Sequence, residues 1–383
     1  MNEPGELTIR TISSLAEVDA SAWDALSTDE DSPFVKHAWL ISLEDAGCLG
    51  LEHGWISQHI TVWRGDRLVA ACPAYLKLNS EGEFVFDHGW ANAADRIGVE
   101  YYPKLIVAVP FTPATGGRLL VRADERRDLL APLLAGAIRT VADKLELSSA
   151  HVLFALERDV EVLEKAGYSM RFGVQNHWQN RGYKTYDDFL ATFNSKRRHQ
   201  LKRERREVIQ SGIETTTHRG ETLTDDALDA MNVFYLSSVE RFKPWTRQYV
   251  NRKFFGLIRD RMPNTLEVVI AREKGQPIAG ALNVLGTNGV LYGRYWGATE
   301  ERPFLHFHVC YYHSIDECIA RGLSTFEPGA GGSHKVPRGF LPSITRSAHY
   351  IANLRFRGMI DRFLEAEREA VLKHVQGDEG DPE

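Results

Sequence analysis

The chain has 383 residues, a net charge of −6, 43% hydrophobic residues and 26% charged residues. This composition is typical of a globular protein, and the length predicts two domains of about 180 residues each. The negative net charge argues against a protein whose whole surface binds nucleic acid.

The sequence also indicates where the protein works. Its four cysteines form no CxxC pair, and the N-terminus lacks the apolar core of a signal peptide. No stretch reaches the roughly 18 continuous apolar residues that a membrane span needs. We therefore expect a cytoplasmic protein with reduced thiols and no membrane span.

The first half is predicted to contain a β-hairpin, a helix and a further strand. Residues 58–64 and 67–76 alternate like strands around a turn at Gly65-Asp66. Residues 126–147 carry apolar side chains at helical spacing and lead to the apolar run 151–156.

The second half repeats this order. Residues 266–272 enter a turn at Lys274 to Pro277 and return as 278–285, while a helix over 304–321 leads to a strand over 324–327. The repeated order suggests an internal duplication. Alternating strands and helices, with hairpins in front, predict mixed α/β domains.

More helix is expected between these regions. Residues 187–210 predict one helix or a pair, and residues 225–261 predict another, interrupted at Pro244. We place the boundary where Gly182 breaks the pattern. The expected parts are an N-terminal domain over 1–181, a C-terminal domain over 182–375 and an acidic disordered tail over 376–383.

The segment FEPGAGGSHKVPRG, residues 326–339, is the strongest candidate for one wall of an active site. Its glycines allow backbone to approach a ligand closely. Glu327 and His334 are the candidate bases, and Lys335 and Arg338 are candidate cations for an anionic part of a substrate. The alternative is an ordinary loop with solvated charges.

Four long segments resemble the FemAB-like N-acyltransferases, and together they extend over most of the chain. They begin SPFVKHAW, EFVFDHGW, KRRHQLKR and LYGRYWGA, and cover residues 32–45, 83–120, 196–213 and 291–342. The resemblance implies tandem duplicated domains like those of the GNAT N-acetyltransferases. The relatives best understood transfer amino acids from aminoacyl-tRNA to peptidoglycan precursors.

The GNAT resemblance implies a turn that holds the pyrophosphate of coenzyme A, of the form Arg/Gln-x-x-Gly-x-Gly/Ala. RYWGA is a partial match, with Arg294 and Gly297 at two of its positions. Glu300 and Glu301 follow directly and would repel a pyrophosphate. A strand end with an acidic helix start is the alternative.

A second candidate for the coenzyme lies in the first half. Gly116, Gly117 and Arg118 follow an apolar strand and precede a helix, which suits an anion. A glycine-rich loop between strand and helix is equally common without a ligand.

Further candidate substrate contacts follow an apparent strand that starts at Glu83. Asp87, His88 and Trp90 stand at its end and Lys104 comes soon after, a mixture typical of pocket linings and also of ordinary strand ends.

The helix over 304–321 places His306, Cys310, His313 and Glu317 in one stripe. We take His306 as a candidate substrate contact. One helical stripe rarely supplies a full coordination sphere, and the resemblance implies no metal, so no metal is expected.

A basic segment opens the second half. Seven of the residues from Ser195 to Arg206 are Lys or Arg, against one acid. The segment favours contact with tRNA or another polyanion, and a solvated helix is the alternative. The candidate contacts are Lys196, Arg197, Arg198, Lys202 and Arg205.

Three functions remain open. The first is an N-acyltransferase that uses acyl-coenzyme A and transfers directly to a small-molecule or peptide amine. The second is an aminoacyl-tRNA-dependent transferase of the peptidoglycan type, and the third is a tandem GNAT-like protein that binds a ligand or partner without catalysis. Neither donor, acceptor nor oligomeric state follows from the sequence.

Overall fold

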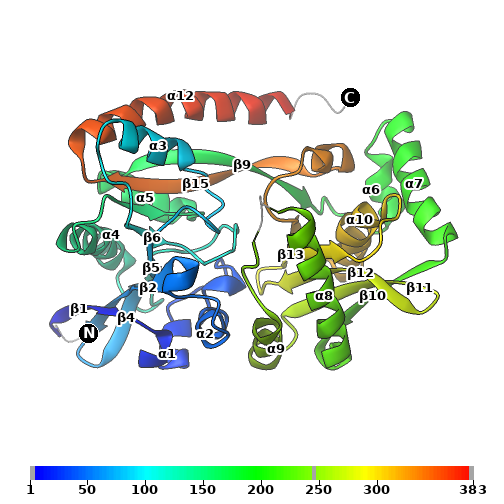
Figure 1. Cartoon of the computed structure of the whole chain (residues 1–383), viewed down its shortest axis with the longest axis horizontal. Helices are drawn as coiled ribbons and strands as arrows, with labels where there is room; N and C mark the ends of the chain where they lie inside the picture. The colour runs from blue at the N-terminus through cyan, green and yellow to red at the C-terminus, as the bar shows by residue number, and fades with distance from the viewer. Residues whose placement is uncertain (1–4, 244–246, 379–383) are drawn as a thin grey trace. The chain divides into compact units, whose positions relative to one another are not determined.

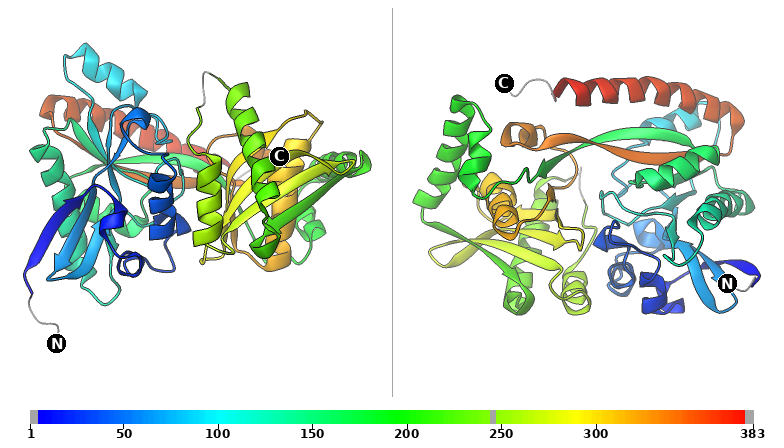
Figure 2. Two further views of the ribbon diagram at one scale, coloured as in Figure 1. Left: turned by 60° about the horizontal axis from the view of Figure 1, so that its bottom comes forward. Right: turned by 180° about the vertical axis from the view of Figure 1, so that it is seen from behind.

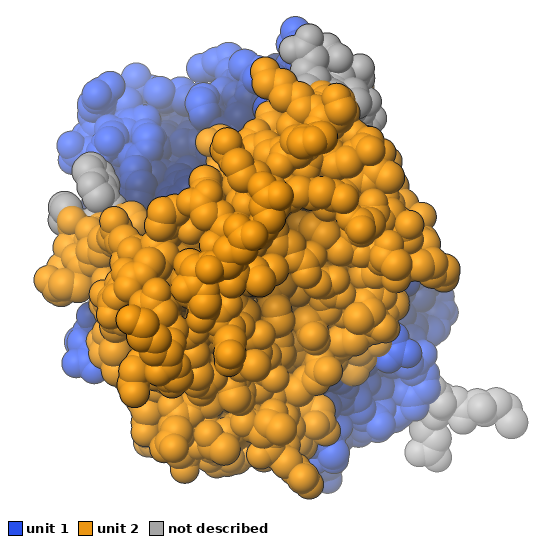
Figure 3. All heavy atoms as spheres, turned by 90° about the vertical axis from the view of Figure 1, so that its right-hand side faces the viewer, with its two compact units in different colours: residues 1–174, 344–374 blue, residues 175–343, 375–383 orange. Residues whose placement is uncertain are grey.

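The computed structural model describes residues 5–243 and 247–378, which fall into two compact units (Figure 3). Unit 1 comprises the described residues up to Val174 together with Ile344–His374. Unit 2 comprises Gln175–Ser343 together with the described residues after His374.

The chain passes between the units inside two long strands. It enters unit 2 within β9 (Ser169–Gln179) and returns within β15 (Leu341–Ile351), which is followed by α12 (Leu354–Asp378). The predicted division into one domain before residue 181 and one after it did not include the return of the chain to unit 1. The expected tail is partly helical, because α12 includes residues 376–378, and the rest of the tail lies outside the described residues.

Unit 1 contains a four-stranded sheet in the order β1-β3-β4-β7 and a second sheet that includes β15-β8-β6-β5-β2 (Figure 1). The turn at Gly65-Asp66 joins β3 to β4, so the predicted hairpin is present. The strands are β1 (Leu7–Ile12), β2 (Trp55–Ser57), β3 (His59–Arg64), β4 (Arg67–Cys72), β5 (Ala74–Lys77), β6 (Lys104–Val107), β7 (Leu120–Val121) and β8 (Ser149–Val152).

Helices cover both sheets of unit 1. Leu134 and Ile138 of α4 pack into the same core as Ile60 and Val62 of β3. On a separate cluster, Phe356 of α12 packs beside α3. The helices are α1 (Ala20–Asp24), α2 (His37–Asp45), α3 (His88–Arg96), α4 (Arg127–Lys144) and α5 (Glu157–Lys165).

Unit 2 is built on a sheet in the order β10-β11-β12-β13-β14-β9. The predicted hairpin at Lys274 to Pro277 is present, with its turn between β11 and β12. Whether it is equivalent to the hairpin of unit 1 stays a prediction. The strands are β10 (Ile213–Arg219), β11 (Leu266–Glu273), β12 (Gln276–Leu285), β13 (Val290–Ala298) and β14 (Thr325–Glu327).

Helices lie on both faces of this sheet, as the left view of Figure 2 shows. Gly280 of β12 faces Phe234 of α8, whereas its neighbours Ala279 and Ala281 pack with Val309 on the other face. The helices are α6 (Tyr186–Ala191), α7 (Ser195–Gln210), α8 (Asp225–Arg241), α9 (Arg252–Arg261), α10 (Leu305–Phe307) and α11 (His313–Arg321), with a π-helical segment over His308–Tyr312. Pro244 lies outside the described residues.

Strand β13 carries an irregularity that shapes the site. Leu282 of β12 pairs with Tyr295, and the next residue, Asn283, pairs with Gly293, so Arg294 is the extra residue of a β-bulge. Strand β14 pairs in parallel with β13 only as far as Tyr292. The remainder of β13 therefore extends beyond the end of β14. No helix in the described part of the chain is long and apolar enough to cross a membrane.

Candidate active site

Glu327 ends β14 at the point where pairing with β13 stops. The residue is only 9% exposed, and its Oε2 has no hydrogen-bond partner among the described residues. Burial raises the pKa of this carboxyl to about 7, although the charge of Arg294 opposes the shift. A carboxyl that titrates near neutral pH suits a general base.

His177 of β9 faces Glu327, with Nε2 4.0 Å from Oε2. Burial lowers the pKa of His177 to about 4, so the imidazole is neutral at pH 7. Its Nε2 also lies 3.2 Å from Gln175 Oε1. The sequence analysis missed His177. The only signal was a polar alternation, Gln175 and His177, in an otherwise ordinary strand.

A pocket of about 70 Å³ lies on the bulged part of β13. The strand residues Asn283 and Arg294 line it, as do aromatic side chains and His306 from the helix. Burial lowers the pKa of Arg294 to about 10, and its guanidinium lies 5.4 Å from the centre of the Tyr292 ring. Phe326 and Pro328, the neighbours of Glu327 in the chain, also line the pocket.

The two predicted histidines lie together beside this pocket. The rings of His306 and His334 are 5.5 Å apart, and His334 Nε2 is 2.9 Å from the Tyr311 hydroxyl. Burial lowers the pKa of His306 to about 4. Burial and the charges of Lys335 and Arg338 also lower the pKa of His334. The structure thus brings His306 and His334 together, both neutral at pH 7.

The two cations that were predicted to bind an anion donate hydrogen bonds to carbonyl groups of their own loop. Lys335 Nζ donates to the Gly329 carbonyl at 2.6 Å, and burial lowers its pKa to about 8. Arg338 donates to Glu204 Oε2 at 2.8 Å, to the Tyr312 hydroxyl at 2.9 Å and to the His334 carbonyl at 2.8 Å. Arg338 therefore anchors the loop to α7, and its predicted role as a substrate contact stays a prediction.

Gly297 has a packing role, and its predicted contact with a coenzyme stays a prediction. A Cβ added there would lie 1.7 Å from the Phe234 carbonyl oxygen, so the glycine permits α8 to lie directly on β13. Glu300 is ion-paired with Arg302. Of the two matching positions in the predicted turn, Arg294 lines the pocket, as do Tyr295 and Trp296 between them.

The backbone N–H groups of the glycine pair in the first half likewise donate to acceptors within the protein. Gly117 N–H donates to Asp31 at 2.8 Å, and Gly116 N–H donates to the Phe154 carbonyl at 3.0 Å. The Arg118 side chain is fully buried and donates to three backbone carbonyls, those of Ala114, Gly117 and Leu153. These hydrogen bonds give the loop a structural role, and the predicted coenzyme contacts Gly116, Gly117 and Arg118 stay predictions.

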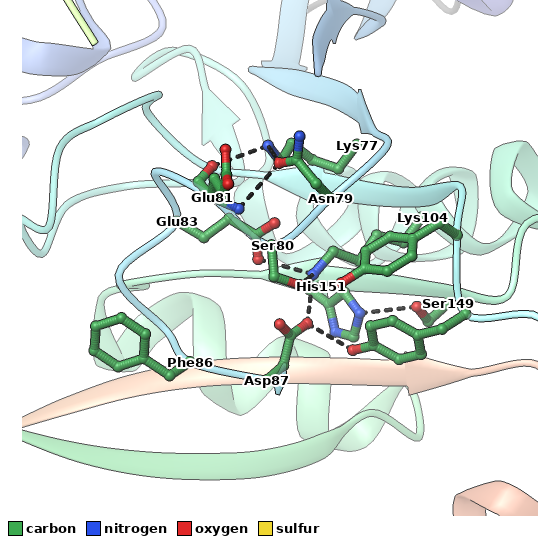
Figure 4. Close-up of polar contacts among 12 residues, drawn as sticks. Lys77, Asn79, Ser80, Glu81, Glu83, Phe86, Asp87, Lys104, Ser149 and His151 are labelled. Atoms are coloured by element: carbon green, nitrogen blue, oxygen red, sulfur yellow. Dashed lines mark hydrogen bonds and ion pairs between the residues drawn. The ribbon is translucent and has the colours of Figure 1, made fainter. Parts of the chain in front are cut away.

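In unit 1, Asp87 and Lys104 belong to a buried ionic cluster (Figure 4). Lys104 Nζ is ion-paired with Asp87, lies 2.9 Å from Glu83 Oε2 and donates to Ser80 at 3.0 Å. Burial raises the pKa of Glu83 to about 7, whereas the positive charge of Lys104 holds that of Asp87 at about 2 against the effect of burial. Because Lys104 is fully buried and paired with both carboxyl groups, the cluster is an internal ion network.

The other two predicted contacts of this region, Trp90 and His88, differ in their exposure to solvent. Trp90 is buried in α3 with its ring 4.8 Å from that of His349, and His349 Nδ1 lies 2.7 Å from His151 Nδ1. His88 is exposed. The expected strand is a loop followed by α3 (His88–Arg96), because Phe84 adopts a positive φ of 59° that interrupts any strand. A shared substrate site here finds no support in this arrangement.

The basic segment forms α7, and its cations divide into two groups. Arg197, Arg198 and Arg205 contact Gln200, the Phe193 carbonyl and Asp316, respectively. Lys202 is exposed, with a surface ion pair to Asp187 at 2.8 Å. The exposed cations of the helix are Lys196, Lys202, Arg203 and Arg206.

The π-helical segment divides the predicted polar stripe of the helix into two pairs of residues that face different surroundings. His306 and Cys310 line the pocket, whereas His313 bonds to Thr217 at 2.8 Å and Glu317 is ion-paired with Arg219 at 3.0 Å. The wider turn adds a residue and rotates the later positions, which a uniform 100° step does not allow for. No group of three or more His, Cys, Asp or Glu placed to hold a metal occurs in the described part of the chain.

These features define a mixed α/β protein with two compact units, of which unit 2 carries a buried carboxyl, Glu327, whose chain neighbours line a small polar and aromatic pocket. A sequence model of the FemAB-like family, described as peptidoglycan biosynthesis/recognition, matches residues 14–380. The chain therefore belongs to the FemAB-like family. Both this membership and the mixed α/β class are as the sequence predicted.

Solved structures show the same fold at low identity. FemX is 13% identical, with a TM-score of 0.51 over 90% of this chain and 98% of that one. L-PGS from Bacillus licheniformis is 11% identical, with a TM-score of 0.51 over 84% of this chain and 95% of that one. The C-terminal domain of a putative lysylphosphatidylglycerol synthetase from Agrobacterium fabrum is 12% identical, with a TM-score of 0.52 over 91% and 97%. A search of curated proteins found no match.

Proposed function

We propose that the protein is an acyltransferase of the aminoacyl-transfer type, which moves a small acyl or aminoacyl group to an amine. The observation that carries the proposal is Glu327, a buried carboxyl with an unpartnered oxygen and a pKa of about 7. FemAB-like membership supports the same reaction class.

Glu327 acts as the general base. An amine attacks the acyl carbonyl only after losing a proton, and Glu327 Oε2 accepts that proton as the new C–N bond forms. The bond from the acyl carbon to its carrier then breaks, and the carrier oxygen or sulfur leaves with the second proton that the nitrogen loses as it becomes an amide. Burial keeps the Glu327 carboxylate basic against the opposing charge of Arg294, and neutral His177, 4.0 Å away, adds no further positive charge.

The pocket beside Arg294 suits a small acyl group. Its volume of about 70 Å³ is well below the range of about 300–1,000 Å³ found for pockets that take whole small ligands. Acetyl, glycyl or alanyl groups fit such a space, whereas a lysyl side chain would extend beyond it. Arg294 and Asn283 line the pocket as polar partners for the acyl group.

Aminoacyl-tRNA is the donor that the site supports best. The residues expected to hold coenzyme A, namely Gly297 and the Gly116 to Arg118 loop, have packing roles or internal hydrogen bonds. The exposed cations of α7 remain available for phosphates. Acyl-coenzyme A is the alternative donor, with Arg294 as its remaining predicted contact.

A label-transfer assay tests the proposal. The protein is incubated with radiolabelled alanyl-tRNA or acetyl-coenzyme A and with amino sugars or peptides that carry a free amine. We expect label in the amine product from alanyl-tRNA, and at least a hundredfold less with Glu327→Gln. If neither donor gives product above the level of that variant, the proposal fails.

A further inference from the structure

Unit 1 contains a larger cavity that the proposed reaction does not use. A groove of about 550 Å³ lies between β1 and α4, on the left in Figure 1. Leu133 and Val141 of α4 line it, together with Ile9 of β1 and Leu145 just after the helix. Ile9 is 41% exposed and Leu145 is 45% exposed, so the groove leaves apolar surface open to water.

The groove exists because α4 stops short of the sheet edge. Strand β1 is the edge strand, and Ile9 pairs with Val62 of β3, so both side chains point to the same face. Val62 is fully buried in the core that α4 covers. Helix α4 packs on β3, β4 and β7, and the corresponding face of β1 forms a wall of the groove.

Helix α4 presents a second face to this groove. Leu133, Gly136, Thr140 and Lys144 follow one another at spacings of three or four residues, and all of them line it. A Cβ added to Gly136 would meet no heavy atom within 4 Å. The glycine therefore leaves open the space that a side chain would otherwise fill.

The charge of the groove has one sign. Its charged lining residues are Arg10 and Lys144, but the Arg10 side chain points to the opposite face of β1 from Ile9 and Thr11, so Lys144 supplies the charge. Arg10 stacks over the Trp63 ring at 5.3 Å. An apolar groove whose lining contains the Lys144 ammonium and no acid is complementary to an amphiphile with a negative head.

We propose that this groove binds a single long alkyl chain with an anionic headgroup, of the fatty-acid type. The volume lies within the range of about 300–1,000 Å³ found for small-ligand sites. One turn of a helix about 10 Å wide occupies roughly 420 Å³, so a partner helix would seat little more than one turn. The chain lies along Ile9 and Val141, and Lys144 contacts the carboxylate.

Calorimetric titration of the full chain with octanoate, decanoate and dodecanoate tests the proposal. Each added methylene is expected to lower the Kd about fourfold, because each one leaves water for the groove. Dodecylammonium should bind at least tenfold more weakly than dodecanoate. Absent dodecanoate binding, a Kd independent of chain length, or equal binding of the ammonium would each overturn the proposal.

Two helical glycines give a matched pair of variants. Gly136→Leu should fill the groove and raise the Kd for dodecanoate at least tenfold, while leaving the thermal midpoint unchanged or higher, since leucine favours helix more than glycine. Gly358→Leu on α12, where a Cβ would meet only the end of the Arg362 side chain at 4.0 Å, should leave the Kd unchanged.

Lys144→Glu should weaken dodecanoate but not dodecanol. If Gly136→Leu binds dodecanoate as wild type does, the site lies elsewhere and the proposal is wrong. If sedimentation shows a dimer that Gly136→Leu dissociates and no fatty acid binds, a second copy of the chain is the occupant instead. None of these outcomes depends on transferase activity.

Discussion

Replacing Glu327 by glutamine should stabilise the protein at alkaline pH. The carboxyl has a pKa of about 7 in the folded chain, against a reference value of 4.5. Between these values the folded state binds more protons than the unfolded state, so the stability of the wild type falls as pH rises through this window. The glutamine amide is neutral throughout and escapes this loss.

The magnitude follows from the shift. A difference of 2.5 pKa units at 1.36 kcal/mol per unit corresponds to about 3 kcal/mol, fully developed above pH 7 and below about 1 kcal/mol at pH 5. Urea unfolding followed by tryptophan fluorescence at pH 5 and pH 8 measures it. Glu207→Gln on the exposed side of α7 is the control and should change stability equally little at both pH values. A Glu327→Gln variant that is no more stable than wild type at pH 8 would refute the account of a buried, proton-accepting carboxyl.

Three other outcomes are expected. Lys104→Met should lower the free energy of unfolding by about 3–5 kcal/mol, because two buried carboxyl groups lose their partner, and a loss below about 1 kcal/mol in urea unfolding would contradict the ion network. Gly297→Ala should lower it by about 3 kcal/mol or more through the clash with the α8 backbone, and a stable variant with weakened coenzyme affinity would restore the coenzyme role. Changing Lys196, Arg203 and Arg206 together to alanine should reduce the log-log salt slope of tRNA filter binding by roughly two to three units, and an unchanged slope would remove α7 from the tRNA contact.

Local patterns predicted the elements that depend on neighbours in the chain. The hairpins around Gly65 and Gly275 follow from alternating strands and turn residues, and the structure has both. The sequence indicates Glu327 because an acid, a glycine-rich bend and basic side chains lie together in residues 326–339, and its role as the base stays a prediction. Here the local sequence carried the information that the structure uses.

The remaining features depend on contacts between distant residues. The return of residues 344–374 to unit 1 is invisible to periodicity, since it depends on β15 pairing with β8. His177 enters the site only because β9 pairs with β14. Arg338 seemed available to a substrate because its partner, Glu204, is remote in sequence. The π-helical segment likewise changes which side chains of the helix share a face.

The pH dependence of aminoacyl transfer tests the central claim most directly. The rate is measured between pH 5.5 and 8.5 for wild type and Glu327→Gln, with the donor that gives product. We expect a wild-type rate that rises with pH to a plateau, with a midpoint near 7, because only the ionised carboxyl accepts a proton. In Glu327→Gln the rate should be at least a hundredfold lower and that midpoint absent. A variant that keeps the wild-type midpoint and more than a tenth of the rate would show that Glu327 is not the base.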